Sequence, residues 1–423
     1  MNQSDLIQNR SKLIELLPVG SFAVLFSGEA PHKSADALYP YTANRNFYYL
    51  TGCDRENFIL VLVKGKVFSG CYLFIEEASD YATKWIGRRL TKEEVVEKSG
   101  LPIENIRFVE EFSKFVTGAV LSDSRPALIE KPSAIFLDLY RYKPYAKPDA
   151  LVRAESILES YPELDIRAIN PLIESLRTFK SASEVDQIRQ ALAYSKIGLE
   201  SVWTIGKPGV NERQIEAFYE YSIKMAGSKG PSFDSIVASG AHATTLHYTD
   251  NNDTIKEGDM VLLDMGALSG LYASDISRTF PANGHFTARQ RQIYDIVLGA
   301  NKATIDFIKP GIMWAEVNAF ARNYLAEACV KIGLISSKEE ITKYYYHNVS
   351  HYLGLDVHDV GSYKIPLAPG MVMTVEPGLY IEEEGIGIRI EDNVLVTEQG
   401  CENLSVAILK EADDIEAFIK RSR

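Results

Sequence analysis

The chain has 423 residues, of which 46% are hydrophobic and 24% charged, and its formal net charge is −12 at pH 7. This acidic balance, without any basic run, argues against nucleic acid as a binding partner. The four cysteines are scattered and form no CxxC pair, so neither a disulfide framework nor a zinc knuckle is indicated. The N-terminus lacks a signal-peptide core and no apolar run is long enough to cross a membrane, so we expect a cytoplasmic protein with no membrane partner.

Residues 1–170 alternate between strand-like and helix-like segments, which predicts an α/β domain. Helices are expected at Lys92–Lys98 and Glu110–Val120. The expected strands are Phe22–Phe26, Phe47–Leu50, Phe58–Val63, Tyr72–Ile75 and Ala134–Leu137. No cluster of catalytic residue types occurs in this region, so we expect the chemistry to lie further along the chain.

A second domain is expected over residues 171–423, and its sequence contains an internal repeat. Ser181 and Glu184 form a capping-box signature at the start of its first long helix. KPGVNERQIEAF at 207–218 then aligns with KPGIMWAEVNAF at 309–320, and GDMVLLDMG at 258–266 aligns with GMVMTVEPG at 370–378. The duplication predicts two similar α/β halves related by a pseudo-twofold axis, with the functional site between them.

The repeat also pairs acidic residues of the two halves. It places Asp264 on Glu376, and each half supplies another carboxylate downstream, Asp275 in the first and Glu391 in the second. Ser269-Gly270 is a candidate hairpin turn that would put Asp264 opposite Asp275, with Cβ atoms about 4.5–5.5 Å apart. Two bare carboxylates at that distance repel each other, so a cation between them is expected.

His351 adds one imidazole to these four carboxylates. The oxygen-rich donor set suits two divalent cations such as Mn²⁺, Co²⁺, Mg²⁺ or Zn²⁺ rather than a structural thiolate site. Paired metal ions, roughly 3.5–4 Å apart, activate water in many hydrolases, so we predict a two-metal hydrolytic site. A weaker alignment places His247 on His358, which makes these two histidines candidates for roles outside the metal shell.

Several long motifs resemble those of a known family. GDMVLLDMG, SDISRTF, HNVSHYLGLDVHDVG, TVEPGLYI and GIGIRIED are similar to the metal-binding motifs of the pita-bread metallopeptidases, with the closest likeness to the aminopeptidase P (Xaa-Pro aminopeptidase) group. The likeness covers essentially the whole chain. It implies an aminopeptidase P/creatinase-like N-terminal domain over 1–170, a pita-bread catalytic domain over 171–423, and a homo-oligomer, either a dimer or a tetramer.

The resemblance also implies roles for individual residues. The implied ligands of two divalent metal ions, with manganese expected, are Asp264, Asp275, His351, Glu376 and Glu391. Glu376, in the EPG motif, would also carry the proton to the leaving nitrogen. The implied catalytic and substrate-binding residues around the metals are His247, His347, His358, Tyr380 and Arg389. Arg389, two residues before Glu391, is expected to hold that carboxylate with its guanidinium group.

The implied reaction is removal of the first residue from peptides that carry proline in second position. The main alternative is a prolidase, which cleaves Xaa-Pro dipeptides and needs a cation or donor for the free proline carboxylate. Apart from Arg389, the motifs contain no evident basic residue for that carboxylate, so longer Xaa-Pro peptides are the expected substrates. A catalytically silent binding protein of the same fold is the second alternative, and the full ligand set argues against it.

Overall fold

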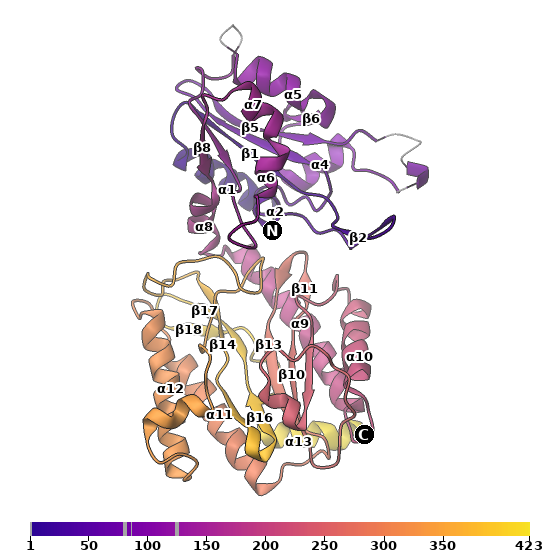
Figure 1. Ribbon diagram of the computed structural model, residues 1–423, viewed down its shortest axis with the longest axis vertical. Helices are drawn as coiled ribbons and strands as arrows, with labels where there is room; N and C mark the ends of the chain where they lie inside the picture. The colour runs from indigo at the N-terminus through magenta and orange to yellow at the C-terminus, as the bar shows by residue number, and fades with distance from the viewer. Residues whose placement is uncertain (1, 79–82, 86, 123–126) are drawn as a thin grey trace. The chain divides into compact units, whose positions relative to one another are not determined.

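The computed structural model describes residues 2–78, 83–85, 87–122 and 127–423, and the chain divides into two compact units, residues 1–177 and 178–423 (Figure 1). Both units mix helices and strands, so the α/β class predicted from the sequence is confirmed. In the described part of the chain, no helix combines the length and the apolar character that crossing a membrane requires.

The first unit is built on a six-stranded mixed sheet. Its strands are β1 (Ser21–Phe26), β4 (Ile59–Lys64), β5 (Ser69–Ile75), β6 (Ile106–Phe108), β7 (Ala134–Leu137) and β8 (Asp165–Ala168), in the order β6-β5-β4-β1-β7-β8. A small hairpin pairs β2 (His32–Ser34) with β3 (Ala37–Leu38). The helices are α1 (Gln3–Leu16), α2 (Arg45–Thr51), α4 (Lys92–Ser99), α5 (Phe112–Phe115), α6 (Asp149–Arg153), α7 (Glu155–Ser160) and α8 (Asn170–Arg177).

The strands expected near residues 22, 58, 72 and 134 are confirmed as β1, β4, β5 and β7, but the strand predicted at Phe47–Leu50 is wrong. Its aromatic residues lie in α2 instead. The side chain of Asn44 accepts a hydrogen bond from Phe47 N (2.9 Å) and so caps the start of this helix. Gly52, at φ +66°, ends it. The two capping residues therefore outweigh the β propensity of the segment between them.

The second unit contains two halves with the same order of elements. In the first half, the helices α9 (Ala182–Ile205) and α10 (Glu212–Met225) precede a three-stranded sheet of β9 (Ile236–Ser239), β10 (Met260–Met265) and β13 (Ile276–Pro281). In the second half, α11 (Ala288–Phe307) and α12 (Trp314–Lys331) precede a sheet of β14 (Val372–Val375), β17 (Asp392–Val396) and β18 (Cys401–Asn403). Each helix pair lies beside the sheet of its own half (Figure 1).

Two short hairpins and a last helix complete the second unit. The hairpins are β11 (Leu268–Ser269) with β12 (Tyr272–Ala273) and β15 (Gly378–Ile381) with β16 (Ile386–Arg389), and the helix is α13 (Ala412–Ser422). α13 packs on α9, where the rings of Trp203 and Phe418 meet edge-on at 5.6 Å between centroids. Ser181 caps α9 through the capping box with Glu184 that the sequence predicted.

The aligned motifs occupy matching places in the two halves. α10 and α12 begin at aligned positions, and β10 and β14 carry the second pair of motifs. The counterpart of β9 is the segment 349–353, which lies along β14. Glu376 N donates to Val349 O (2.9 Å) and Thr374 N donates to His351 O (3.0 Å). His351 therefore lies beside β14, as β9 lies beside β10.

The hairpin that carries the first two acidic residues has a different register from the one expected. The turn is Gly270-Leu271 rather than Ser269-Gly270, and Gly270 adopts φ +59°. Asp264 consequently pairs with Ser277 and not with Asp275. Residues two apart on a strand face the same side, so Asp275, directly before β13, still lines the same cavity as Asp264.

The two halves are joined where β13 meets the start of β17. Glu391 N donates to Ser277 O (3.0 Å). The side chain of Asn393 bonds both main-chain groups of Asp275, because its Oδ1 accepts from Asp275 N (3.1 Å) and its Nδ2 donates to Asp275 O (2.6 Å). The main chain at one acidic residue of each half is thereby bonded to the other half.

Candidate metal centre

A cavity of about 380 Å³ lies where the two halves of the second unit meet. Its lining residues are Leu246, His247, Asp264, Asp275, His347, Asn348, Ser350, His351, His358, Tyr363, Glu376, Arg389 and Glu391. All five expected metal ligands are among them, as are four of the other five expected site residues. The remaining one, Tyr380, contacts the cavity through His347.

Each half supplies its carboxylates from the ends of two neighbouring strands of its sheet. Asp264 lies near the end of β10 and Asp275 directly before β13, whereas Glu376 directly follows β14 and Glu391 directly precedes β17. The strands behind them are apolar and buried, so the main chain at each ligand is held by a packed sheet. Ligands on rigid elements are positioned more precisely than ligands on loops.

The side chains converge on one region of the cavity. His351 Nε2 lies 3.3 Å from Asp275 Oδ2 and 3.6 Å from Glu376 Oε1. One potential ligand atom from each of Asp275, His351 and Glu391 lies within 4.8 Å of the other two. His351 Nδ1 lies 2.9 Å from Tyr352 O, to which only an N–H can donate. In the neutral ring, Nε2 therefore presents its lone pair to the carboxylates, as a metal-ligating histidine does.

Burial and mutual repulsion shift the pKa values of these groups. Burial, together with the charge of Asp264, raises the pKa of Asp275, and burial raises the pKa of Glu376 to about 7. Burial and the charges of Asp275 and Glu376 also raise the pKa of Glu391 well above its ordinary value. Burial lowers the pKa of His351, but its hydrogen bond to Asp275 and the charge of Glu376 outweigh that effect and raise it to about 9. The cavity thus binds positive charge, which protons or metal ions can supply.

The residues present fit a divalent metal. Glu391 Oε1 is buried and has no hydrogen-bond partner among the residues that the structure describes, whereas Oε2 accepts from Ser277 Oγ (2.7 Å). A buried carboxylate oxygen without a donor costs free energy unless a cation binds it. Oxygen ligands with one imidazole and no thiolate suit a hard or borderline divalent ion. The residues that would hold it are Asp264, Asp275, His351, Glu376 and Glu391.

Arg389 bonds a different carboxylate from the one expected. Its Nη2 donates to Asp264 Oδ2 (2.8 Å), its Nε to Ser277 Oγ (2.7 Å) and its Nη1 to the Tyr380 hydroxyl (3.1 Å). The expectation that Arg389 holds Glu391 directly is therefore wrong. Arg389 ends β16, which packs against β10, so its guanidinium group reaches across to Asp264. It meets Glu391 through the shared hydroxyl of Ser277.

His347 is held in one orientation by both ring nitrogens. Nδ1 lies 2.8 Å from Asn348 O and so carries the proton, and Nε2 accepts from the Tyr380 hydroxyl (2.8 Å). Burial and the charge of Arg389 lower the pKa of His347 to about 4. His347 is therefore a neutral imidazole near pH 7, and it lies 3.8 Å (Nδ1 to Oε2) from Glu376.

The two histidines that the repeat paired both line the cavity. The His358 ring meets the His351 ring edge-on, with centroids 4.2 Å apart at 85°. Burial and the charges of His351 and His247 lower the pKa of His358, so its ring is neutral near pH 7. His247 lies in the loop after a short 3-10 helix, Gly240–Thr244, of the first half. Beyond the candidate ligands, the first half thus contributes His247, and the second half contributes His347 and His358.

Ser277 is a site residue that the sequence analysis missed. Its hydroxyl accepts from Arg389 and donates to Glu391, so it links two charged groups in the cavity wall. The sequence contained a signal for it, because Ser277 follows Asp275 by two residues and must face the same side of the strand. Four residues that line the cavity were also missed and carry no comparable signal in the sequence: Leu246, Asn348, Ser350 and Tyr363.

Comparison with known proteins identifies the family. The model of metallopeptidase family M24 matches residues 186–398, and that of the aminopeptidase P N-terminal domain matches residues 6–127. The Xaa-Pro aminopeptidase of Escherichia coli (strain K12) is 31% identical over an alignment of 453 positions, which covers 100% of this chain and 99% of that protein. The chain belongs to metallopeptidase family M24 and, within it, to the aminopeptidase P group of pita-bread enzymes, as the motifs predicted.

Solved structures agree with this assignment. A protein from Bacillus anthracis is 44% identical, with a TM-score of 0.95 and coverage of 100% of this chain and 99% of that one. Aminopeptidase P from E. coli with the inhibitor Pro-Leu is 32% identical, with a TM-score of 0.89 and the same coverage. The E. coli enzyme has also been solved in a zinc-substituted form with product. The expected fold is confirmed, and the chain is a metal-dependent aminopeptidase.

Proposed function

We propose that the chain is a two-metal aminopeptidase that removes the first residue from peptides with proline in second position. The observation that carries this proposal is the convergence of four carboxylates and one imidazole, drawn from both halves, in one buried cavity. The E. coli relative described above is an Xaa-Pro aminopeptidase, which supports the substrate class. We propose manganese as the metal, because the donor set is rich in oxygen.

The proposed reaction breaks the bond between the first residue's carbonyl carbon and the proline nitrogen. When bound, two divalent ions would lower the pKa of the attacking water and polarise the scissile carbonyl. Glu376 would accept a proton from that water and deliver it to the proline nitrogen as the C–N bond breaks. Its place at the end of β14 supports this role, because the packed strand limits where the carboxylate can point.

The remaining side chains would bind and orient the peptide. His247 and His358, one from each half, would donate hydrogen bonds to the oxyanion that develops on the carbonyl oxygen. His347 would contact the substrate in the single orientation that Asn348 and Tyr380 impose on its ring. Arg389 would hold Asp264 in place from the opposite side.

Metal content tests the centre directly. We expect elemental analysis of the purified chain to find two divalent ions per chain. Removal of the metal with a chelator should abolish activity, and Mn²⁺ should restore it, because the carboxylates alone cannot activate water sufficiently. One bound zinc ion per chain together with full activity would contradict the two-metal centre.

Peptide length tests the choice between an aminopeptidase P and a prolidase. A prolidase must hold the free carboxylate of a terminal proline. Arg389, the only Lys or Arg among the described residues that line this cavity, already bonds Asp264, Ser277 and Tyr380. We therefore expect Ala-Pro-Ala to be cleaved with a higher kcat/KM than Ala-Pro, measured side by side with Mn²⁺ present. Efficient cleavage of the dipeptide with none of the tripeptide would instead identify a prolidase.

The proposal also includes a cellular compartment and an oligomeric state. The cysteines Cys53, Cys71, Cys329 and Cys401 are free thiols, which supports the reducing, cytoplasmic compartment expected from the sequence. Assembly into a dimer or tetramer stays a prediction, which light scattering on the purified chain would test.

A further inference from the structure

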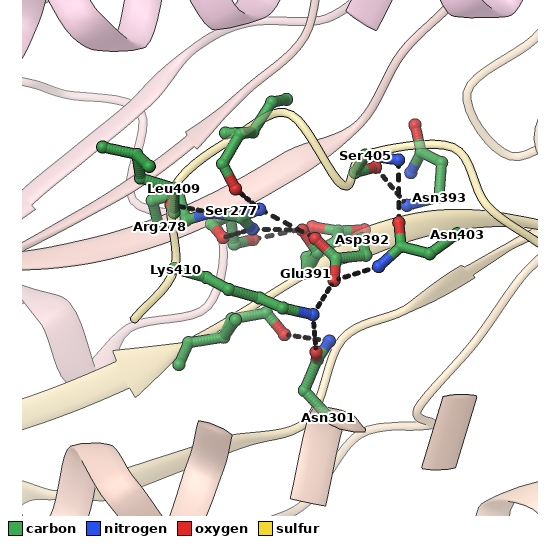
Figure 2. Close-up of polar contacts among 12 residues, drawn as sticks. Ser277, Arg278, Asn301, Glu391, Asp392, Asn393, Asn403, Ser405, Leu409 and Lys410 are labelled. Atoms are coloured by element: carbon green, nitrogen blue, oxygen red, sulfur yellow. Dashed lines mark hydrogen bonds and ion pairs between the residues drawn. The ribbon is translucent and has the colours of Figure 1, made fainter. Parts of the chain in front are cut away.

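A charged cluster lies behind the strand that carries Glu391, on the side away from the cavity. It consists of Arg278, Asp392 and Lys410, which we call the rear cluster (Figure 2). Arg278 and Asp392 are fully buried, and the side chain of Lys410 is 15% exposed. Arg278 and Asp392 each directly follow a residue of the cavity wall, Ser277 and Glu391. Because side chains alternate along a strand, these rear groups face away from the position that a metal would occupy.

Arg278 holds the main chain of the cavity wall. Its Nη1 donates to Ser277 O (2.9 Å) and to Glu391 O (2.5 Å), and its Nη2 donates to Asp392 Oδ1 (2.7 Å). The remaining Asp392 oxygen accepts from Lys410 Nζ and from Asn403 Nδ2 (3.0 Å) (Figure 2). One carboxylate therefore ties a buried arginine and a lysine together directly behind Glu391.

Lys410 is also linked, through Asn301, to β14, the strand that precedes Glu376. Its Nζ donates to Asn301 Oδ1 (2.8 Å), and Asn301 Nδ2 donates to Val375 O (3.0 Å) and Ile390 O (3.3 Å). Val375 and Ile390 directly precede the two candidate glutamate ligands. Asn301 is itself fully buried on α11. The ammonium group of Lys410 thus donates directly to Asp392, which follows Glu391. Through the side chain of Asn301 it is also linked to the main chain directly before Glu376 and Glu391.

The segment that carries Lys410 is fixed by the same cluster. Arg278 Nε donates to Leu409 O (2.9 Å), and Tyr294 OH donates to Lys410 O (2.8 Å). Its position is therefore set by side-chain hydrogen bonds rather than by a regular element, since residues 404–411 are neither helix nor strand. A segment after the last strand is thereby bonded to the residues behind the candidate metal centre.

We propose that Lys410, through Asp392 and Asn301, is a positioning residue for the metal ligands Glu376 and Glu391, so that its loss weakens metal binding while the chain still folds. The inference rests on the proposed metal centre. Side chains that orient metal ligands from outside typically change metal affinity about 10- to 100-fold when they are removed. Lys410 acts on two ligand segments at once and touches neither ligand side chain.

The direction in which metal affinity changes when Lys410 is replaced separates a positioning role from a purely electrostatic one. Lys410 is a cation, and by Coulomb's law the removal of a positive charge near a cation site strengthens metal binding. Positioning requires the opposite, because ligands that are less well held bind the ion less tightly. A role in stability alone predicts a lower melting temperature with an unchanged metal dissociation constant. The three explanations therefore predict three different results for one variant.

The experiment is a calorimetric titration of Mn²⁺ into the metal-free full-length chain. Lys410→Met keeps the length of the side chain and leaves Asp392 bonded to Arg278 and Asn403, so it should fold. We expect its dissociation constant for Mn²⁺ to rise about 10-fold or more, and Lys410→Arg to recover most of the affinity. Lys302→Met is the matched control, because Lys302 forms an exposed ion pair with Glu411, next to Lys410 in the chain.

A second variant tests the same inference in case Lys410→Met does not fold. Asn301→Ala removes the amide that bonds Val375 O and Ile390 O, and we expect it to weaken Mn²⁺ binding about 10-fold as well. Unchanged or tighter Mn²⁺ binding by Lys410→Met, or equal weakening by Lys302→Met, would overturn the inference. Failure of the wild-type chain to bind Mn²⁺ would instead overturn the proposed metal centre and the inference with it.

Discussion

Replacement of Glu376 by Gln is expected to lower turnover roughly 10²- to 10⁴-fold, which is the range that loss of a general acid–base group usually produces. The amide has the shape of the carboxylate but can neither accept the proton of water nor deliver it to the proline nitrogen. Steady-state kinetics on Ala-Pro-Ala with excess Mn²⁺ measures the loss. Metal analysis of the same samples separates lost proton transfer from lost metal.

The matched control for this change is Glu383→Gln. Glu383 follows β15 on the same hairpin region but is exposed and pairs with Lys343 at the surface, so its turnover should equal that of the wild type. Near-normal turnover of Glu376→Gln with both metals bound would refute the proposed proton transfer. If the variant instead loses metal and recovers its turnover at high Mn²⁺, Glu376 acts only as a metal ligand.

Replacement of Arg389 by Gln is expected to destabilise the second unit by about 3–5 kcal/mol, because it leaves Asp264 buried without its cation. Arg389 and Asp264 have side-chain exposures of 5% and 15%, so solvent can screen the orphaned charge only slightly. Thermal unfolding of the metal-free chain measures the loss. We also expect turnover to fall about 10- to 100-fold, since Asp264 and Ser277 lose a shared donor.

Arg389→Lys tests whether charge alone is sufficient. A lysine keeps the positive charge but cannot bond Asp264, Ser277 and Tyr380 at once, because it lacks the planar fork of the guanidinium group. We expect it to recover part of the stability and little of the turnover. Full recovery of both quantities would show that Arg389 contributes charge and not geometry. Arg291→Gln, which breaks exposed pairs with Asp295 and Asp413, should change stability by less than about 1 kcal/mol.

The candidate site could be predicted from the sequence to the extent that it depends on the repeat. Alignment of the two halves placed Asp264 and Glu376 at equivalent strands, and the structure has Asp264 on β10 and Glu376 directly after β14. Strand alternation would also have indicated Ser277. The partner of Arg389 could not be predicted, because it depends on how β16 packs against β10, which no local pattern records.

The errors in secondary structure and register have a common physical cause. Phe47–Leu50 resembles a strand because aromatic residues favour strands, yet Asn44 and Gly52 cap it as a helix. The hairpin turn shifted by one residue because Gly270 supplies the positive φ at the first turn position rather than at the second. In both cases a single residue with a special backbone role decided the local structure, and averaged propensity does not capture such residues.

The bonds that join the two halves also constrain how the chain can be synthesised. Ser277 and Glu391 are 114 residues apart in sequence, and Asp275 and Asn393 are 118 apart. Contacts of such long range form late in folding, and a growing chain cannot make them until residue 393 has left the ribosome. A product truncated before residue 351 would hold Asp264 and Asp275 without His351 or Arg389. The full set of candidate ligands is therefore complete only in a chain that extends to Glu391, and a chain that ends before residue 351 keeps the first two acids alone.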